Sequence, residues 1–310
     1  MASCRAEIGS SMVGGMNPAT PQGLSILHHN RRVMLKWHRL RRRRADPLFG
    51  AGNLALGLQL GASMEVDLRV TADGDFAVLH DDVLDEETDG IGPVAIHKRP
   101  ALAGLHYDDA GVPGVARHGR RLLFLDDLIA LLRDARPQAL LQLDIKDDLA
   151  TIGARGLGRL ADALQGDGLP VIVSSDCNDL ILALGQRLPN VARGLEPSFR
   201  LMDLFARGDV KGAEALLRAE LAGSVQPRMV YLHWTMVLDA LDAGLDFVAI
   251  CHDEGKAVDA WTFTPANPAE GFTETEWHAF SRLLELGVDQ ITTDEAVATE
   301  AAYAKRVGLG

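Results

Sequence analysis

Short apolar segments alternate with helical patterns along almost the whole chain, and this alternation limits the possible fold more than any other feature. Eight segments are strand candidates, and most of them have the continuous apolar character of strands that are covered on both faces by helices. These strand candidates are 33–37, 63–70, 140–145, 170–174, 191–195, 229–233, 258–263 and 290–293. Helical patterns lie between them at 53–60, 125–134, 152–164, 178–188, 214–222, 236–243 and 274–286.

Eight such alternations without internal repeats predict an α/β protein with a (β/α)8 TIM barrel, and 310 residues is an ordinary length for that fold. An open doubly wound sheet is the alternative, but no glycine-rich dinucleotide loop follows the first strand. Segment 84–121 is rich in glycine, proline and charge, which predicts a loop-rich insertion after the second strand. We expect residues 1–30 to be a disordered leader and residues 31–310 to form one barrel.

Composition excludes several classes of protein. The net charge of −12 argues against binding to nucleic acid or to an anionic membrane surface. No stretch approaches the roughly 20 apolar residues of a membrane helix, and the N-terminus lacks the apolar run of a signal peptide. Three scattered cysteines are too few for a disulfide framework or a zinc site. We therefore expect a cytoplasmic protein, and the sequence carries no signal for an oligomeric state.

Polar side chains occupy the ends of several predicted strands. Glu65 and Asp67 share one face of their strand, because side chains two residues apart point the same way. Asp144 and Lys146 repeat this spacing on the next strand. In a barrel these groups meet at the C-terminal mouth, where active sites form. Three carboxylates are hard oxygen ligands suited to Mg²⁺ or Ca²⁺, and their mutual repulsion requires a cation or Lys146 to offset it.

Each signal also has a structural explanation when it is taken alone. A Glu-x-Asp pair is more commonly part of an ion-pair network, and His80, next to Asp81, equally suits a hydrogen-bonded structural histidine. His38, which ends the first strand, has the same two interpretations. The combination favours a functional site, because each group lies at the C-terminal end of a different predicted strand.

The motifs together resemble the glycerophosphodiester phosphodiesterase family of metal-dependent (β/α)8 barrels. The resemblance rests on His38-Arg39 after the first strand, "GASMEVD" (61–67), "TADGDFAVLHD" (71–81) and the Leu-x3-Thr-x-Gly-x-Gly pattern of 84–92. It continues with "LDIK" (143–146), "AWT" (260–262) and "GVDQITTD" (287–294), so that it spans roughly residues 33–298.

Three departures from the family pattern concern the substrate more than the reaction type. Leu40 stands where the family usually has glycine, and "ADPLFGAGN" (45–53) occupies the place of a Pro-Glu-Asn-Thr element. Asp144 replaces the usual glutamate, as in the related spider-type sphingomyelinase D enzymes, which share the barrel and the two histidines.

The resemblance implies that Glu65, Asp67 and Asp144 hold one divalent cation, Mg²⁺ or Ca²⁺, with Mn²⁺ as a further candidate. It implies that His38 and His80 form the acid–base pair, because an imidazole titrates near neutral pH. Which histidine is the acid stays open, and the attacking group is either water or a neighbouring substrate hydroxyl that first forms a cyclic phosphate.

Four further residues are expected to bind substrate. Arg39 and Lys146 would face the phosphate, Trp261 would form an apolar wall, and Glu196, after the strand at 191–195, would contact substrate hydroxyls. The arginine run 39–44 suits either a second phosphate clamp or a solvated charged segment.

These residues predict a phosphodiesterase that hydrolyses glycerophosphodiesters or similar small diesters to an alcohol and a phosphomonoester. A phospholipase D-like enzyme acting on lysolipids is one alternative. It would need an exposed apolar rim, which the insertion does not show in its sequence. A non-catalytic barrel that binds an anionic ligand is the other. The missing Pro-Glu-Asn-Thr element favours it, and the retained histidines, carboxylates and lysine count against it.

Overall fold

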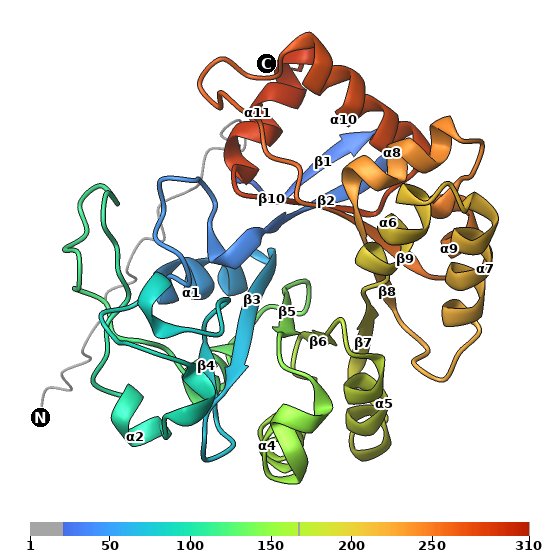
Figure 1. Cartoon of the computed structure of the whole chain (residues 1–310). Coiled ribbons are helices and arrows are strands. Elements are labelled where there is room, and N and C mark those ends of the chain that lie inside the picture. Colours follow the sequence, from blue (N-terminus) through green and yellow to red (C-terminus); the bar gives the residue numbers. More distant parts are fainter. Residues whose placement is uncertain (1–20, 167, 310) are drawn as a thin grey trace, which may run out of the picture.

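The computed structural model describes residues 21–166 and 168–309. Ten strands alternate with helices along this part of the chain (Figure 1). The strands are β1 (Ser25–His28), β2 (Arg31–Trp37), β3 (Ser63–Val70), β4 (Phe76–Val78), β5 (Leu140–Ile145), β6 (Val171–Ser174), β7 (Ala192–Leu195), β8 (Met229–His233), β9 (Ala257–Trp261) and β10 (Gln290–Thr293).

The helices lie around the outside of the strands (Figure 1). The α-helices are α1 (Ala51–Leu60), α2 (Arg99–Leu102), α3 (Leu125–Leu132), α4 (Leu149–Leu164), α5 (Asn178–Arg187), α6 (Ser198–Ala206), α7 (Val210–Leu221), α8 (Trp234–Asp242), α9 (Phe247–Asp253), α10 (Glu274–Leu286) and α11 (Ala296–Arg306). Three 3-10 turns complete the set, η1 (His38–Leu40), η2 (Leu84–Glu86) and η3 (Val94–Ile96).

Eight strands close into a parallel barrel. They follow the order β2-β10-β9-β8-β7-β6-β5-β3, and β3 pairs again with β2 to close the ring. The predicted (β/α)8 TIM barrel is therefore confirmed. All eight C-terminal strand ends lie at one mouth, which is where the candidate polar side chains converge.

Two strands lie outside the ring. β4 forms an antiparallel hairpin with β3, and β1 pairs antiparallel with the first half of β2. The expectation of a disordered leader up to residue 30 is therefore wrong for Ser25–His28. The indole N–H of Trp37 also holds this segment by donating to the carbonyl of Gly23 at 2.6 Å. Residues 1–20 of the expected leader lie outside the described residues.

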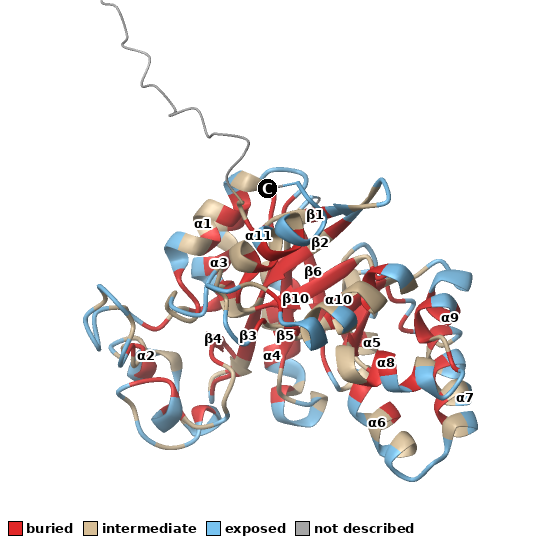
Figure 2. Ribbon diagram, turned by 90° about the horizontal axis from the view of Figure 1, so that it is seen from above, coloured by how far each residue is buried: buried red, intermediate tan, exposed pale blue. Residues whose placement is uncertain are grey.

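The insertion 84–121 is rich in loops, as the sequence predicts: its helical elements are η2, η3 and the four-residue α2, and isolated β-bridges such as Thr88–Tyr107 join its loops. It lies beside β4 at one edge of the molecule (Figure 2). Buried Tyr107 anchors it by donating a hydrogen bond to the carbonyl of Val78 at 2.8 Å. Arg120 pairs with Asp109 at 2.5 Å and places its guanidinium 4.8 Å from the Tyr107 ring centre.

The main core lies between the outer face of the barrel and the helices (Figure 2). Fully buried Trp37 and Met64 contribute to it from neighbouring strands. Helix α1 packs against them at Gly57, where a Cβ atom would lie 2.2 Å from the Met64 sulfur. Burying a large apolar side chain contributes about 1.5–3 kcal/mol, so this layer supplies much of the stability. No helix among residues 21–166 and 168–309 is long and apolar enough to cross a membrane.

The inside of the barrel is polar above a small apolar plug. Lys36 and Asp259 are buried there as an ion pair, with 3.1 Å between Nζ and Oδ2. Thr292 and Gln290 donate further hydrogen bonds to Asp259, and the Tyr231 ring centre lies 4.3 Å from the Lys36 ammonium. The plug belongs to a small apolar cluster that includes Leu140, Ile172, Ala192, Met229 and Ala257 and that Tyr231 also joins.

The ion pair predicts a large effect of a nearly isosteric change. Asp259→Asn removes the charge and leaves the Lys36 ammonium buried without its counter-ion. Breaking such a pair costs about 3–5 kcal/mol. Urea unfolding should therefore show a drop of this size in the free energy of unfolding. Glu214→Gln, which breaks an exposed pair with Arg218 on α7, is the matched control and should cost at most about 1 kcal/mol. Equal effects of the two variants would contradict the prediction.

Candidate active site

Three buried carboxylates meet at the C-terminal mouth of the barrel. Glu65 and Asp67 lie on β3, and Asp144 lies on the neighbouring strand β5, where it is in register with Asp67. One oxygen atom from each of the three lies within 4.8 Å of the other two. The structure thus brings together the three residues that the sequence predicts as metal ligands.

Two cationic side chains partly neutralise this cluster. The Lys146 ammonium lies 2.9 Å from Asp67 Oδ1 and also donates to Asp144 Oδ2. The Arg39 guanidinium lies 3.2 Å from Asp67 Oδ2. Burial works to raise the pKa of Asp67, but these two charges overcome it and lower the pKa to about 2.

Glu65 has the opposite behaviour. Burial and the adjacent charge of Asp67 raise its pKa well above the ordinary value, although the backbone N–H of Arg39 donates to its Oε2 at 2.7 Å. Three carboxylates against two cations leave an excess of negative charge when all of them are ionised. A further positive charge at this position would relieve that repulsion.

The donor set fits a hard divalent cation. Among the described residues, buried Asp67 Oδ2 is approached by Arg39 Nε at 3.2 Å but accepts no well-aligned hydrogen bond, so it keeps lone-pair capacity for a cation. All three candidate ligands are carboxylates, which suit Mg²⁺, Ca²⁺ or Mn²⁺ better than zinc or copper.

His38 follows β2 and is oriented by Asp294, the residue after β10. Its Nδ1 lies 2.8 Å from Asp294 Oδ1, which also accepts from Arg41 Nη2 at 2.6 Å. Burial raises the pKa of Asp294, but the hydrogen bond and charge of His38, together with Arg41, lower it to about 2. Asp294 is thus ionised at neutral pH and can only accept, so Nδ1 carries the proton and Nε2 of the neutral ring is free for proton transfer.

Two effects act against each other on His38 itself. Burial lowers the pKa of the imidazole, and the hydrogen bond and charge of Asp294 raise it. The net direction is downward. The ring is therefore largely neutral near pH 7 and available as a proton acceptor there.

His80 lies just beyond β4 and has an equivalent arrangement. Its Nδ1 is 2.7 Å from Asp81 Oδ1, and its side chain is more exposed than that of His38, 36% against 24%. Buried Glu87 fixes the turn by accepting the backbone N–H groups of His80 and Asp81 at 2.7 and 3.1 Å. Both histidines lie close enough to Asp67 for a positive charge on either ring to lower the pKa of that carboxyl.

The turn after β2 places Arg39 over the cluster. Arg39 and Leu40 both have left-handed backbone conformations, with φ of 49° and 62°. That region costs an L-residue roughly 1–2 kcal/mol, which explains why glycine is usual at the position of Leu40. The Leu40 side chain is fully buried, and this burial offsets the strain.

Glu196 and Trp261 lie at the same mouth. Glu196, just after β7, accepts a hydrogen bond from Gln142 at 3.2 Å, and burial and the Asp144 charge raise its pKa. Trp261 ends β9 and packs edge-on against His233 and Phe199, with ring centres 4.9 and 5.9 Å away. The position of Trp261 suits the predicted apolar wall, and that of Glu196 suits a polar contact.

Sequence reasoning missed the residues that orient the others. Asp294 stands within a recognised motif, and the sequence offered the signal of a carboxylate at a strand end without an assigned role. Asp81 was considered only as the neighbour of a structural His80, although it holds the Nδ1 of that ring. Glu87 lies in the insertion, where its approach to His80 depends on tertiary folding. The arginine run 39–44 has two parts. Arg39 and Arg41 pair with the carboxylates Asp67 and Asp294, whereas residues 43–44 are exposed.

A cavity of about 1530 Å³ opens at the other end of the barrel. Its lining includes Leu24, Arg32, Gln138 and Asp289, all of which lie at or before the N-terminal ends of strands. The barrel interior separates it from the carboxylate cluster, and we place the candidate active site at the C-terminal mouth because the titratable groups converge there.

Solved structures with a similar fold include several phosphodiesterases. A phosphodiesterase from Oleispira antarctica, solved in complex with the product sn-glycerol-3-phosphate, has a TM-score of 0.61 and 18% identity, covering 87% of this chain and 96% of that chain. A glycerophosphoryl diester phosphodiesterase from Parabacteroides distasonis has a TM-score of 0.61 and 18% identity, with 90% and 88% covered. A glycerophosphodiester phosphodiesterase from Agrobacterium tumefaciens has a TM-score of 0.60 and 19% identity, with 88% and 99% covered.

At these identities the structural likeness establishes the fold. No curated protein shows significant sequence similarity to the chain. The sequence model of the glycerophosphoryl diester phosphodiesterase family, however, matches residues 54–298, which is most of the chain. The chain therefore belongs to the glycerophosphoryl diester phosphodiesterase family and is a phosphodiesterase.

Proposed function

We propose that the chain is a divalent-metal-dependent enzyme that hydrolyses glycerophosphodiesters or similar small phosphodiesters to an alcohol and a phosphomonoester. The observation that carries the proposal is the placement of two carboxylate-anchored histidines, His38 and His80, beside one buried acidic cluster. The sn-glycerol-3-phosphate held by the Oleispira antarctica phosphodiesterase supports the substrate class.

Glu65, Asp67 and Asp144 would hold the cation. When bound, a divalent cation would supply positive charge to a non-bridging phosphate oxygen and lower the pKa of a coordinated hydroxyl or water. Arg39 and Lys146 add two fixed positive charges beside it, which attract the anionic diester and stabilise the charge that develops during attack.

The two histidines would transfer the protons. One ring takes a proton from the attacking water through its free Nε2, and the other donates a proton to the leaving alkoxide as the P–O bond breaks. Each Nδ1 is held by a carboxylate, which leaves Nε2 as the nitrogen for proton transfer in each ring. Attack by a neighbouring substrate hydroxyl would use the same groups and pass through a cyclic phosphate. Trp261 would pack against the alcohol portion, and Glu196 would bind its hydroxyls.

Phospholipase D-like action on lysolipids is the second candidate, and one observation favours it. The sequence of the insertion gave no sign of an apolar rim, yet Ile91 and Ile96 in it are 78% and 68% exposed. Phe199, beside Trp261, is 57% exposed. These side chains would suit an acyl chain. A panel of glycerophosphocholine, lysophosphatidylcholine and a sugar phosphodiester separates the candidates by kcat/KM, and a preference for the lysolipid would overturn the glycerophosphodiester assignment.

Metal removal tests the proposal most directly. Chelator-treated protein should lose diesterase activity on glycerophosphocholine and bis(p-nitrophenyl) phosphate, and Mg²⁺, Ca²⁺ or Mn²⁺ should restore it. Glu65→Gln should weaken binding of the activating ion, measured by titration calorimetry, because it removes a charged ligand. Exposed Glu214→Gln is the control and should behave as the native protein. Full diesterase activity without any metal would exclude the metal-dependent mechanism.

Removing either histidine should affect turnover rather than metal binding. His38→Ala and His80→Ala should each lower kcat about 10²–10⁴-fold, the usual contribution of a general acid or base. Affinity for the activating ion should change little, because neither ring is a predicted ligand. His106→Ala, which removes an imidazole paired with Asp89 in the insertion, is the matched control and should retain activity. If either active-site variant instead lost metal binding, the assigned roles would be wrong.

Asp294→Asn should reveal which proton His38 transfers. Asp294 raises the pKa of His38 against the effect of burial, so removing its charge lowers that pKa further. The limb of the kcat/KM profile controlled by His38 should then move to lower pH. A shift of the acidic limb identifies His38 as the base, and a shift of the basic limb identifies it as the acid. Asp89→Asn, beside His106, should leave both limbs in place. An unchanged profile in Asp294→Asn would remove His38 from proton transfer.

A further inference from the structure

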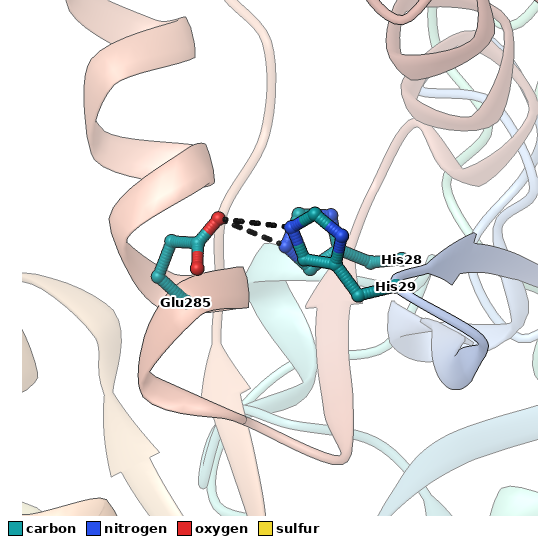
Figure 3. A group of neighbouring side chains, drawn as sticks. All are labelled: His28, His29 and Glu285. Atoms are coloured by element: carbon teal, nitrogen blue, oxygen red, sulfur yellow. Dashed lines mark hydrogen bonds and ion pairs between the residues drawn. The ribbon is translucent and has the colours of Figure 1, made fainter.

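A second group of metal-ligating side chains lies on the outside of the barrel, where the β1–β2 hairpin meets the end of α10. Figure 3 shows His28 and His29 turned toward Glu285. His28 Nε2 and His29 Nε2 lie 3.1 and 3.5 Å from the same carboxylate oxygen, Oε1. The three ligand atoms all lie within 4.8 Å of one another. The turn of this hairpin lies just before the N-terminal end of β2, so the group is at the opposite end of the barrel from the carboxylate cluster.

Tyr303 on α11 fixes the tautomer of His28. The Tyr303 hydroxyl donates its proton to the carbonyl of Leu27 at 2.9 Å, so it can only accept a hydrogen bond from His28 Nδ1, 3.2 Å away. Nδ1 therefore carries a proton, and Nε2 of the neutral ring is a bare lone pair. That lone pair faces a carboxylate oxygen at 3.1 Å, a repulsive contact unless a proton or a metal ion lies between the two acceptors.

The second imidazole favours the metal ion. His29 approaches the same oxygen, and the two ring centres are only 4.2 Å apart. Protonating both rings would place two positive charges side by side, whereas one divalent ion can use both lone pairs and the carboxylate together. With zinc bonds of about 2.0–2.1 Å, tetrahedral ligands are separated by roughly 3.3 Å. The observed separations of 3.1 and 3.5 Å from Oε1 lie on either side of that value.

We propose that His28, His29 and Glu285 form a binding site for a borderline transition-metal ion, with Zn²⁺ as the preferred ion. Imidazole nitrogens select zinc, copper, cobalt or nickel over Mg²⁺ and Ca²⁺, so the site differs in chemistry from the all-carboxylate cluster. The Tyr303 hydroxyl supplies the outer-shell hydrogen bond that orients a histidine ligand. Two imidazoles, one carboxylate and a water complete four-fold coordination.

Arg31 preorganises the site. Its guanidinium donates to the carbonyls of Leu284, Gly287 and Val288 at 2.5–2.7 Å and so holds the hairpin against the C-terminal end of α10. The ion would join two segments that are 257 positions apart in the sequence. Because an ion bound only by the folded state stabilises it, the expected role is a structural clamp between the N-terminal hairpin and the C-terminal helices.

Zinc titration of the full chain tests this assignment. The protein is freed of metal with a chelator and kept in saturating Mg²⁺, so that the carboxylate cluster is supplied with the hard ion it prefers. Zn²⁺ alone is then the probe. Calorimetry gives its stoichiometry and affinity, thermal unfolding gives the Zn²⁺-dependent rise in Tm, and ¹⁵N NMR follows the histidine side-chain nitrogens.

Two variants and a control identify the ligands. His29→Asn keeps a residue type that tolerates the left-handed conformation of this position, and Glu285→Gln keeps the shape of the carboxylate. Each should weaken the zinc site by more than the roughly 10–100-fold caused by losing an outer-shell partner, and should abolish the rise in Tm. His278→Ala, an exposed histidine on the same helix, should bind as the native protein does.

The native protein should show large Zn²⁺-induced shifts of Nε2 in His28 and His29. The assignment is overturned if the native protein binds no Zn²⁺ under these conditions. It is equally overturned if His29→Asn and Glu285→Gln keep the native affinity and the native rise in Tm.

Discussion

The repulsion among three carboxylates on adjacent strands governs the construction of the barrel mouth. Glu65, Asp67 and Asp144 are all buried, and a cluster of this kind cannot remain ionised without compensating positive charge. Lys146 and Arg39 supply two such charges, and both contact Asp67. The raised pKa of Glu65 marks the compensation that the protein itself does not provide. The proposed cation would supply the missing positive charge, and the proposed anionic substrate would then meet a site with no excess of negative charge.

The polar side chains inside the barrel connect the carboxylate cluster at the mouth to a buried ion pair below it. Lys36 pairs with Asp259 and donates to Gln142, and Gln142 donates to Ser174 at 2.9 Å. Ser174 in turn donates to Asp144 Oδ1 at 3.2 Å. Asp144 is thus held from below by a hydrogen-bonded chain that ends on a buried cation. Such a chain limits the positions available to Asp144, whose side chain is one methylene shorter than the glutamate usual in the family.

The sequence predicted best those elements whose pattern is local. The bounds of β3, β5, β8 and β10 agree with prediction. In β3 and β5 an apolar or alternating run ends at a charged or glycine-containing turn, so the local sequence marks the end of the strand. Strand spacing placed Glu65 with Asp67, and Asp144 with Lys146, at the barrel mouth, because strand ends in a barrel converge by topology. The selection of Arg39 and Trp261 depended on the resemblance to the family.

The features that the sequence did not predict depend on contacts between segments that are distant along the chain. Strand β1 is only four residues long and exists because β2 offers it an edge, so its own pattern is too weak to recognise. The helices α6, α9 and α11 were not among the predicted segments, and α9 has only seven residues in which to show a periodicity. Lys36 and Asp259 looked like ordinary polar residues within strands, and only closure of the ring places them face to face.

The loop that replaces the Pro-Glu-Asn-Thr element is relevant to whether the barrel has lost its catalytic activity. Asp46 accepts the backbone N–H groups of Arg42 and 43 at 3.1 Å each, and Asn53 donates to both Asp46 and the carbonyl of Leu40. The backbone N–H of buried Phe49 donates to the carbonyl of Arg39 at 2.9 Å. A loop that had lost its function would not be expected to keep this many hydrogen bonds to the turn that carries Arg39. The replacement therefore supports a loop adapted to hold this arginine over the carboxylates, and it weakens the case for a non-catalytic barrel.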